Sequence, residues 1–142
     1  MGPVRIVVVD DFEPWRRTIV SILKQDPTLE VIREASDGLE AVRMCVALQP
    51  DLVVLDVGLP KLNGLEAARQ IREISPATKI LFMSANGSTE MMREALRMDA
   101  VGYIAKTNAS RHLLPAVKAA MANEKFLSFT LLPEIQKDLP EE

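Results

Sequence analysis

The fold of this chain is decided by residues 4–11, which read VRIVVVDD. A run of β-branched residues of this length predicts a buried strand, and two aspartates follow it. Two further apolar runs, residues 52–55 and 101–105, are followed directly by Asp56 and by Lys106. In open α/β sheets, ligands bind outside the carboxyl ends of the strands. The sequence therefore predicts that three carboxylates and one ammonium group gather around a single point.

Short apolar runs alternate along the chain with segments of helical period. We expect strands at 4–9, 29–34, 51–56, 78–84 and 101–105, and helices at 14–24, 38–48, 64–74, 88–98 and 110–123. The runs 51–56 and 78–84 are apolar throughout, which is typical of parallel strands covered by helices on both faces. The pairs Asp37 with Glu40 and Asn63 with Glu66 have the spacing of helix-capping residues. This pattern predicts a doubly wound α/β fold.

Length and composition indicate one globular domain. The chain has 142 residues, of which 48% are hydrophobic and 26% charged, so we expect a domain over residues 1–123, a C-terminal tail over 124–142 and no output domain. The net charge of -3 argues against direct binding of nucleic acid. No apolar run approaches the roughly 18 residues of a membrane span, and no signal peptide is evident. We therefore expect a cytoplasmic protein.

Asp10, Asp11 and Asp56 are candidate metal ligands. Adjacent carboxylates repel one another, and a hard cation such as Mg²⁺ relieves that repulsion by binding oxygen atoms of both. Alternatively, Asp10 only ends its strand and Asp11 caps the following helix. Asp56 precedes a turn rich in glycine and proline, residues 57–64, and is a candidate metal ligand, nucleophile or both. An aspartate that only hydrogen-bonds its own turn is the alternative for Asp56.

Two more strand ends carry groups suited to a phosphoryl ligand. Ser84 ends the run 80–83 with a hydroxyl donor, and Lys106 supplies a mobile ammonium group. Alternatively, Ser84 begins a turn and Lys106 only pairs with a nearby carboxylate. We expect Trp15 close to the mouth of this pocket, and Arg16 on a solvated face.

The combined motifs resemble the receiver domain of two-component response regulators. They are VDD at 9–11, LDVGLPKLNG at 55–64, MSA at 83–85 and GYIAK at 102–106. The resemblance extends over about residues 4–123. It implies a flavodoxin-like, five-stranded parallel sheet of order 2-1-3-4-5, flanked by five helices.

The resemblance also implies the chemistry of the acidic residues. Asp56 is then the phosphoacceptor, and the cofactor is Mg²⁺. Asp11 and Asp56 bind the metal directly together with the backbone carbonyl of Gly58, and Asp10 holds it through water. Such a domain is not an enzyme in the usual sense, but it assists its own phosphorylation and dephosphorylation.

The remaining motif residues are then the ones that detect the phosphoryl group. Ser84 and Lys106 contact it, and Tyr103 matches the aromatic switch position, expected to rotate into space that Ser84 vacates. The implied donor is a sensor histidine kinase or a histidine phosphotransfer protein. A homodimer or a downstream protein is expected to use the face formed by the fourth helix, the fifth strand and the fifth helix.

Some positions leave alternatives open. Thr107 follows Lys106 where many receivers have proline, and residues 34–38, EASDG, are similar to receivers with helix-turn-helix output. An alternative interpretation is that the chain is the regulatory part of a DNA-binding transcriptional regulator whose helix-turn-helix output domain is absent from this chain. A haloacid dehalogenase type phosphatase would require a second aspartate two residues after its nucleophile. That position is occupied by Gly58.

Overall fold

The computed structural model describes residues 2–85 and 89–127. Its strands are β1 (Val4–Val9), β2 (Leu29–Ala35), β3 (Leu52–Asp56), β4 (Lys79–Ser84), β5 (Gly102–Ala105) and β6 (Phe126–Leu127). Its helices are α1 (Glu13–Leu23), α2 (Gly38–Leu48), α3 (Gly64–Ile74), α4 (Thr89–Arg97), the short 3₁₀ helix η1 (Lys106–Asn108) and α5 (Ala109–Met121). These boundaries lie within a few residues of those expected from hydrophobic periodicity.

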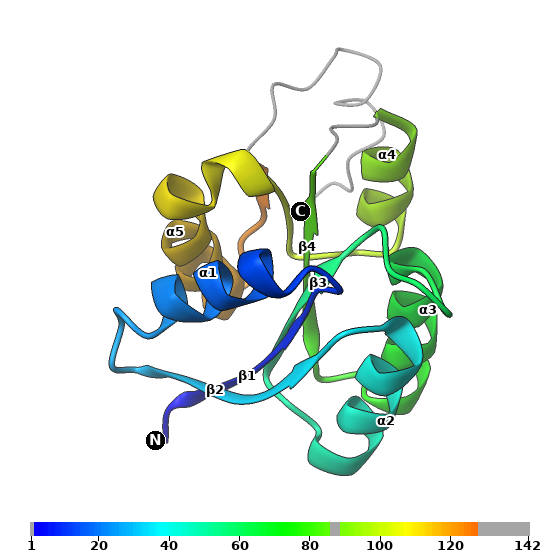
Figure 1. Ribbon diagram of the computed structural model, residues 1–142, viewed down its shortest axis with the longest axis horizontal. Helices are drawn as coiled ribbons and strands as arrows, with labels where there is room; N and C mark the ends of the chain where they lie inside the picture. The colour runs from blue at the N-terminus through cyan, green and yellow to red at the C-terminus, as the bar shows by residue number, and fades with distance from the viewer. Residues whose placement is uncertain (1, 86–88, 128–142) are drawn as a thin grey trace.

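The strands form a single parallel sheet of order β2-β1-β3-β4-β5-β6. Helices α1 and α5 cover one face, and α2, α3 and α4 cover the other (Figure 1). The predicted doubly wound, flavodoxin-like fold is confirmed. Strand β1 pairs with β2 on one side and β3 on the other, so the chain reverses its winding direction between β1 and β3. Ligands of such sheets bind at that switch point.

Two hydrophobic cores lie on either side of the sheet. Side chains of β1, such as Val7 and Ile6, alternate between the two cores because successive residues of a strand point to opposite faces. All five residues of β3 are buried, as expected for a central strand. Cys45 is buried on the α2 face, and burial raises the pKa of its thiol to about 11. This thiol is part of the core.

Both predicted capping pairs are present. The Asp37 carboxylate accepts a hydrogen bond from the amide of Glu40 at 2.8 Å, and the Asn63 side chain accepts one from the amide of Glu66 at 2.9 Å. Each bond satisfies an amide in the first turn of a helix that otherwise lacks a partner. The two caps fix where α2 and α3 begin beside the ends of the strands.

One element was not expected. Residues 126–127 form β6, which pairs in parallel with β5, within the segment that we expected to be only a tail. The ring of Phe126 packs edge-on against His112 of α5, with centroids 5.5 Å apart. Two residues are too few for periodicity to reveal a strand, and this pairing depends on the position of α5.

No helix in the described ranges is long and apolar enough to cross a bilayer.

Candidate functional site

The three predicted carboxylates converge at the carboxyl edge of the sheet. Asp10 and Asp11 follow β1 and Asp56 ends the neighbouring β3, and one oxygen of each lies within 4.8 Å of the others. Asp10 and Asp56 are buried, whereas Asp11 is exposed. Like charges at this spacing in a poorly hydrated site repel strongly, so the group requires positive charge.

Lys106 supplies the nearest positive charge. It follows β5 directly, and its ammonium nitrogen lies 2.7 Å from Asp10 Oδ2 and 3.1 Å from Asp56 Oδ2. Only 5% of its side chain is exposed. Lys106 therefore pairs with two carboxylates of the pocket in this structure, and its contact with a phosphoryl group stays a prediction. One ammonium group leaves an excess of negative charge on the three carboxylates.

The backbone also holds two of the aspartates. Asp10 Oδ1 accepts a hydrogen bond from the amide of Phe12 at 2.9 Å, and Asp56 Oδ1 accepts one from the amide of Gly58 at 3.2 Å. The first residue of α1 is preceded by Phe12, and no side chain caps that end, so Asp11 does not act as the helix cap. Asp11 lines the same cavity as Asp56, and its exposed side chain is accessible to a ligand.

The pKa of Asp56 is raised above its ordinary value. Burial is the largest cause, because removal of water disfavours the carboxylate, and the nearby Asp10 adds to it. Lys106 and the amide of Gly58 act in the opposite direction. The raised pKa shows that the attraction of Lys106 only partly offsets the cost of burying this charge.

An arginine that we expected on a solvated face instead fixes the acidic loop. Arg16 of α1 donates from Nη1 to the backbone carbonyl of Asp10 at 2.9 Å, and its Nε lies 3.1 Å from Glu34 at the end of β2. Its side chain is 19% exposed. Arg16 therefore ties together β1, β2 and α1 at the point where the aspartates begin. No sequence signal pointed to this contact.

The loop after Asp56 is held by a close contact with α3. The amide of Gly64 donates to the carbonyl of Val57 at 2.9 Å. A Cβ atom at position 64 would lie 2.2 Å from the Asp56 carbonyl oxygen, so only glycine permits this approach. The start of α3 thereby fixes the backbone of Asp56.

A cavity of about 430 Å³ opens above these groups. It is lined by Asp11, Phe12, Trp15, Asp56, Val57, Gly58, Ser84, Ala85 and Lys106. The centroid of the Trp15 ring lies 5.9 Å from the Lys106 nitrogen, which confirms its expected place at the pocket mouth. Carboxylate oxygens and a backbone carbonyl are the donors that Mg²⁺ prefers, so the residues present fit such an ion.

Comparison with known proteins assigns this arrangement to a family. The profile of the response regulator receiver domain matches residues 6–118. The chain belongs to the response regulator receiver domain family. The resemblance inferred from the motifs is thereby confirmed, and the chain is a signalling domain of the response regulator class.

Individual relatives show the same relationship. The nitrate/nitrite response regulator protein NarL of Escherichia coli is 33% identical over 137 residues, which cover 96% of this chain and 63% of NarL. The chemotaxis protein CheY of Listeria monocytogenes is 34% identical over 116 residues, covering 82% of this chain and 97% of CheY. The receiver domain thus spans less than two thirds of NarL but nearly all of CheY.

Solved structures agree. The crystal structure of a two-component response regulator of the LuxR family from an Aurantimonas species superimposes with a TM-score of 0.83 at 30% identity. The match covers 97% of this chain and 96% of that one. The backbone that carries the receiver site is therefore shared over almost the whole chain.

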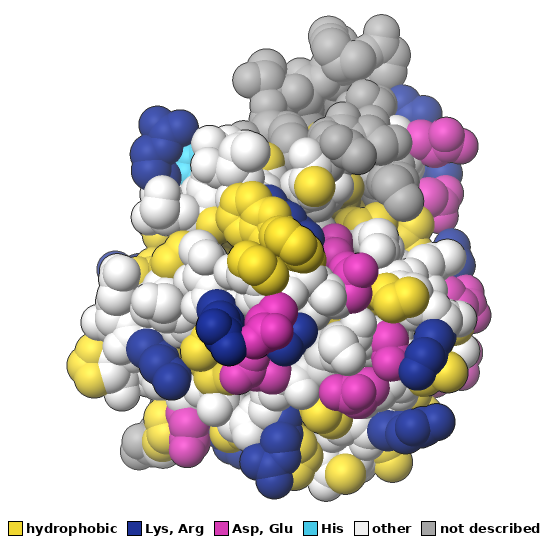
Figure 2. All heavy atoms as spheres, in the orientation of Figure 1, with side chains coloured by type: hydrophobic (Ala, Val, Ile, Leu, Met, Phe, Trp, Pro, Cys, Tyr) yellow, Lys and Arg dark blue, Asp and Glu magenta, His cyan; other side chains and the backbone are white. Residues whose placement is uncertain are grey.

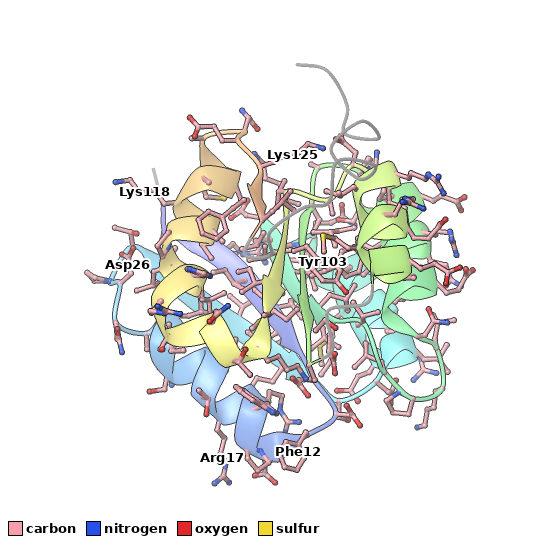
Figure 3. All side chains as sticks on the ribbon, turned by 90° about the horizontal axis from the view of Figure 1, so that it is seen from above. Phe12, Arg17, Asp26, Tyr103, Lys118 and Lys125 are labelled. Carbon is pink, nitrogen blue, oxygen red and sulfur yellow. The ribbon has the colours of Figure 1, made fainter. Side chains whose placement is uncertain are left out.

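Ser84 and Tyr103 form the inner side of the site. Ser84, the last residue of β4, is 5% exposed, and Tyr103 of β5 is fully buried. Burial raises the pKa of the Tyr103 hydroxyl, and its hydrogen bond with Ser84 counteracts that rise. Tyr103 lies in the interior on the α4 side of the sheet (Figure 3). The ring is already buried in this state, and its rotation into space that Ser84 vacates stays a prediction.

Proposed function

We propose that this receiver domain is a phosphorylation-dependent switch in which Asp56 accepts the phosphoryl group of a phosphohistidine. The observation that carries this proposal is the position of Asp56 in the cavity, between a buried ammonium group and two further carboxylates. A carboxylate with a raised pKa is kept in place by Lys106 and faces solvent through the cavity. The phosphoryl donor is a sensor histidine kinase or a histidine phosphotransfer protein.

The reaction transfers the phosphoryl group from nitrogen to oxygen. One Asp56 carboxylate oxygen attacks phosphorus, the nitrogen–phosphorus bond breaks, and its electron pair remains on the imidazole of the donor. Lys106, whose ammonium nitrogen lies 3.1 Å from Asp56 Oδ2, neutralises charge on the transferring oxygens. Asp11, Asp56 and the Gly58 carbonyl would hold Mg²⁺ directly and Asp10 would hold it through water, and the ion would supply further neutralisation of this charge. Attack of water on phosphorus then breaks the Asp56 oxygen–phosphorus bond, restores the carboxylate and releases inorganic phosphate, which ends the signal.

Ser84 and Lys106 connect the phosphoryl group to the rest of the molecule. Both side chains line the same cavity as Asp56, and Ser84 also hydrogen-bonds Tyr103. If Ser84 turns toward the phosphoryl oxygens, it must give up or rearrange its bond with Tyr103. That exchange makes Tyr103 and the α4-β5-α5 face sensitive to phosphorylation, because a switch requires contacts that differ between its two states.

The proposal includes a cytoplasmic location and signalling through a homodimer or a downstream protein at the α4-β5-α5 face. The alternative is that the chain is the regulatory part of a DNA-binding transcriptional regulator. It is supported by the 37% identity over 124 residues to the DNA-binding transcriptional activator DevR/DosR of Mycobacterium tuberculosis. Asp56 has the same role in both.

Phosphorylation by acetyl phosphate tests the assignment. With Mg²⁺ present, the intact mass should rise by one phosphoryl group, and Asp56→Asn should abolish the gain. Asp99→Asn is the matched control, because Asp99 is exposed at the opposite end of β5 and should keep the gain. Persistence of the added mass in Asp56→Asn would place the phosphoacceptor elsewhere.

A further inference from the structure

The cavity above Asp56 is lined by both charged and apolar side chains. Asp11, Asp56 and Lys106 are charged, and the apolar residues, which we call the apolar wall, include Phe12 and Trp15. A phosphoryl group and a metal ion interact with oxygen and nitrogen atoms, so neither makes use of the apolar wall. At about 430 Å³ the cavity also has room for more than these two groups. The apolar wall therefore points to the part of the donor that carries the phosphoryl group.

Phe12 is the exposed aromatic residue of this wall. It is 55% exposed, although burial of an aromatic ring stabilises a protein and large apolar side chains are commonly covered. Its amide is held by Asp10 Oδ1 at 2.9 Å, so the same aspartate that belongs to the acidic cluster also positions Phe12. Figure 3 shows Phe12 projecting outward at the start of α1.

Trp15 places a second ring next to the reacting atoms. Residues 12 and 15 are three apart at the beginning of a helix, a spacing that puts side chains on one side. The Trp15 ring centroid lies 5.9 Å from the Lys106 nitrogen, and that nitrogen lies 3.1 Å from Asp56 Oδ2. Figure 2 shows hydrophobic side chains gathered over the start of α1, next to acidic ones. The aromatic surface thus borders the position that a phosphoryl group on Asp56 would occupy.

We propose that Phe12 and Trp15 bind the imidazole ring of the phosphodonor, so that this domain favours phosphoimidazole-type donors over acyl phosphates. The inference rests on the proposed function and names the donor chemistry that the site selects. In phosphohistidine the ring is bonded directly to phosphorus, so it enters the cavity together with the phosphoryl group. Aromatic rings attract one another in stacked or edge-on contacts, and a protonated imidazole gains further from the face of tryptophan. Acetyl phosphate presents only a methyl group to this wall.

The transfer balances without any additional reactant. The donor ring carries a proton on its second nitrogen, the bond between its first nitrogen and phosphorus breaks, and the electron pair of that bond remains on the ring. Neutral imidazole leaves, and a new oxygen–phosphorus bond forms on Asp56. Phe12 and Trp15 make contact with the leaving ring and exchange no proton.

The test compares two small donors on the same protein. Labelling rates are measured by intact mass with phosphoimidazole and with acetyl phosphate, both with Mg²⁺, and the ratio of the two rates is the readout. Phe12→Ala and Trp15→Ala should each lower this ratio by about three- to tenfold, the loss expected for one aromatic contact. Phe12→Tyr retains the ring and should retain the ratio, whereas Phe12→Leu retains apolar volume without the ring and should lower it.

Val46→Ala is the matched control, because Val46 is also 55% exposed but lies on α2, outside the cavity lining. It should leave the ratio unchanged. The proposal that these rings bind the donor imidazole would be overturned if both alanine variants kept the wild-type rate ratio. It would also be overturned if Phe12→Leu kept that ratio. Failure of both donors to label the wild type would instead overturn the proposed function. Circular dichroism checks the fold of each variant, and since Phe12 is exposed, its substitution does not disturb the core.

Discussion

Asp56 is the residue at which burial and charge conflict most. It must be accessible to a donor, yet it ends a central strand whose residues are all buried. The result is a carboxylate with a raised pKa that one ammonium group stabilises only in part. The negative charge at this site lowers the stability of the fold when no ligand is bound. A bound cation relieves the repulsion between the carboxylates.

Asp56→Asn should therefore stabilise the protein in the absence of metal. Because the pKa of Asp56 is higher in the folded state than its ordinary value of 3.8, the folded state binds a proton more tightly than the unfolded state. The contribution of Asp56 to stability then decreases as the pH rises above that ordinary value. The gain in Tm on Asp56→Asn should be largest near neutral pH and shrink toward pH 4, with each kcal/mol corresponding to about 2–4 °C. A gain that is constant from pH 4 to pH 8 would show that ionisation is not the cause.

Lys106→Ala should have the opposite effect. Its removal leaves the Asp10 carboxylate, which is fully buried, without the counter-charge 2.7 Å away. Loss of one partner of a buried pair costs about 3–5 kcal/mol, and Mg²⁺ should restore part of it by supplying another positive charge. Urea unfolding with and without Mg²⁺ measures both quantities. Lys61→Ala is the control, since Lys61 also pairs with an aspartate, Asp37, but is 66% exposed and should change stability far less.

Among the elements, β3 and α3 must approach each other closely to place Asp56. Gly64 at the start of α3 lies against the backbone of the strand end, and its amide bonds Val57. Arg16 of α1 has a comparable role on the other side, where it joins the Asp10 carbonyl to Glu34 of β2. Helix starts, and not only strand ends, therefore determine where the carboxylates lie.

Gly64→Ala should move Asp56 and destabilise the fold. The new Cβ would lie 2.2 Å from the Asp56 carbonyl oxygen and 2.7 Å from Val57 Cα, and backbone atoms cannot yield as a flexible side chain does. We expect a loss of about 1–3 kcal/mol in urea unfolding, as for other overpacked positions, and slower labelling by acetyl phosphate. Gly58→Ala tests the same loop without the clash, since nothing lies within 4 Å of its Cβ, and its stability should match the wild type. Equal losses in the two variants would argue against a specific role of the contact at Gly64.

For the whole molecule, metal binding and folding should be linked. The acidic cluster is assembled from β1 and β3, which lie 46 residues apart at Asp10 and Asp56 and are brought together only in the folded state. A ligand that binds only the folded state stabilises it by about 2.7 kcal/mol at one hundred times its Kd. Tm should consequently rise with Mg²⁺ concentration, and the fluorescence of Trp15, the only tryptophan, should change over the same range.

Asp11→Ala should weaken both responses, because it removes an exposed carboxylate of the cluster without disturbing the buried Asp10–Lys106 pair. Asp99→Ala, which removes an exposed carboxylate far from the cavity, should leave both midpoints where they are in the wild type. A Mg²⁺ response in Asp11→Ala with the wild-type midpoint would place the metal at a different site.

Much of this molecule can be predicted from local sequence. Hydrophobic periodicity is set by residues that are near one another in the chain, so the boundaries of β1, β3, α2 and α3 follow from it. The convergence of Asp10, Asp11, Asp56 and Lys106 also follows, because the carboxyl ends of adjacent parallel strands must meet at one edge of a sheet. The sequence alone therefore determined the fold, the edge that carries the site and the charged residues in it.

Tertiary packing decided the partners of the individual side chains. Arg16 looks like a surface residue in its helix, and only the placement of β2 and β1 brings Glu34 and the Asp10 carbonyl within its reach. Tyr103 is buried because α4 packs over its face of the sheet. Strand β6 forms because α5 ends at a point from which the chain can pair with β5. Phe12 becomes part of a cavity wall only because the strand ends form the rest of the cavity. Periodicity assigns each residue to a face of its own element, whereas the atoms it meets belong to elements that are distant in sequence.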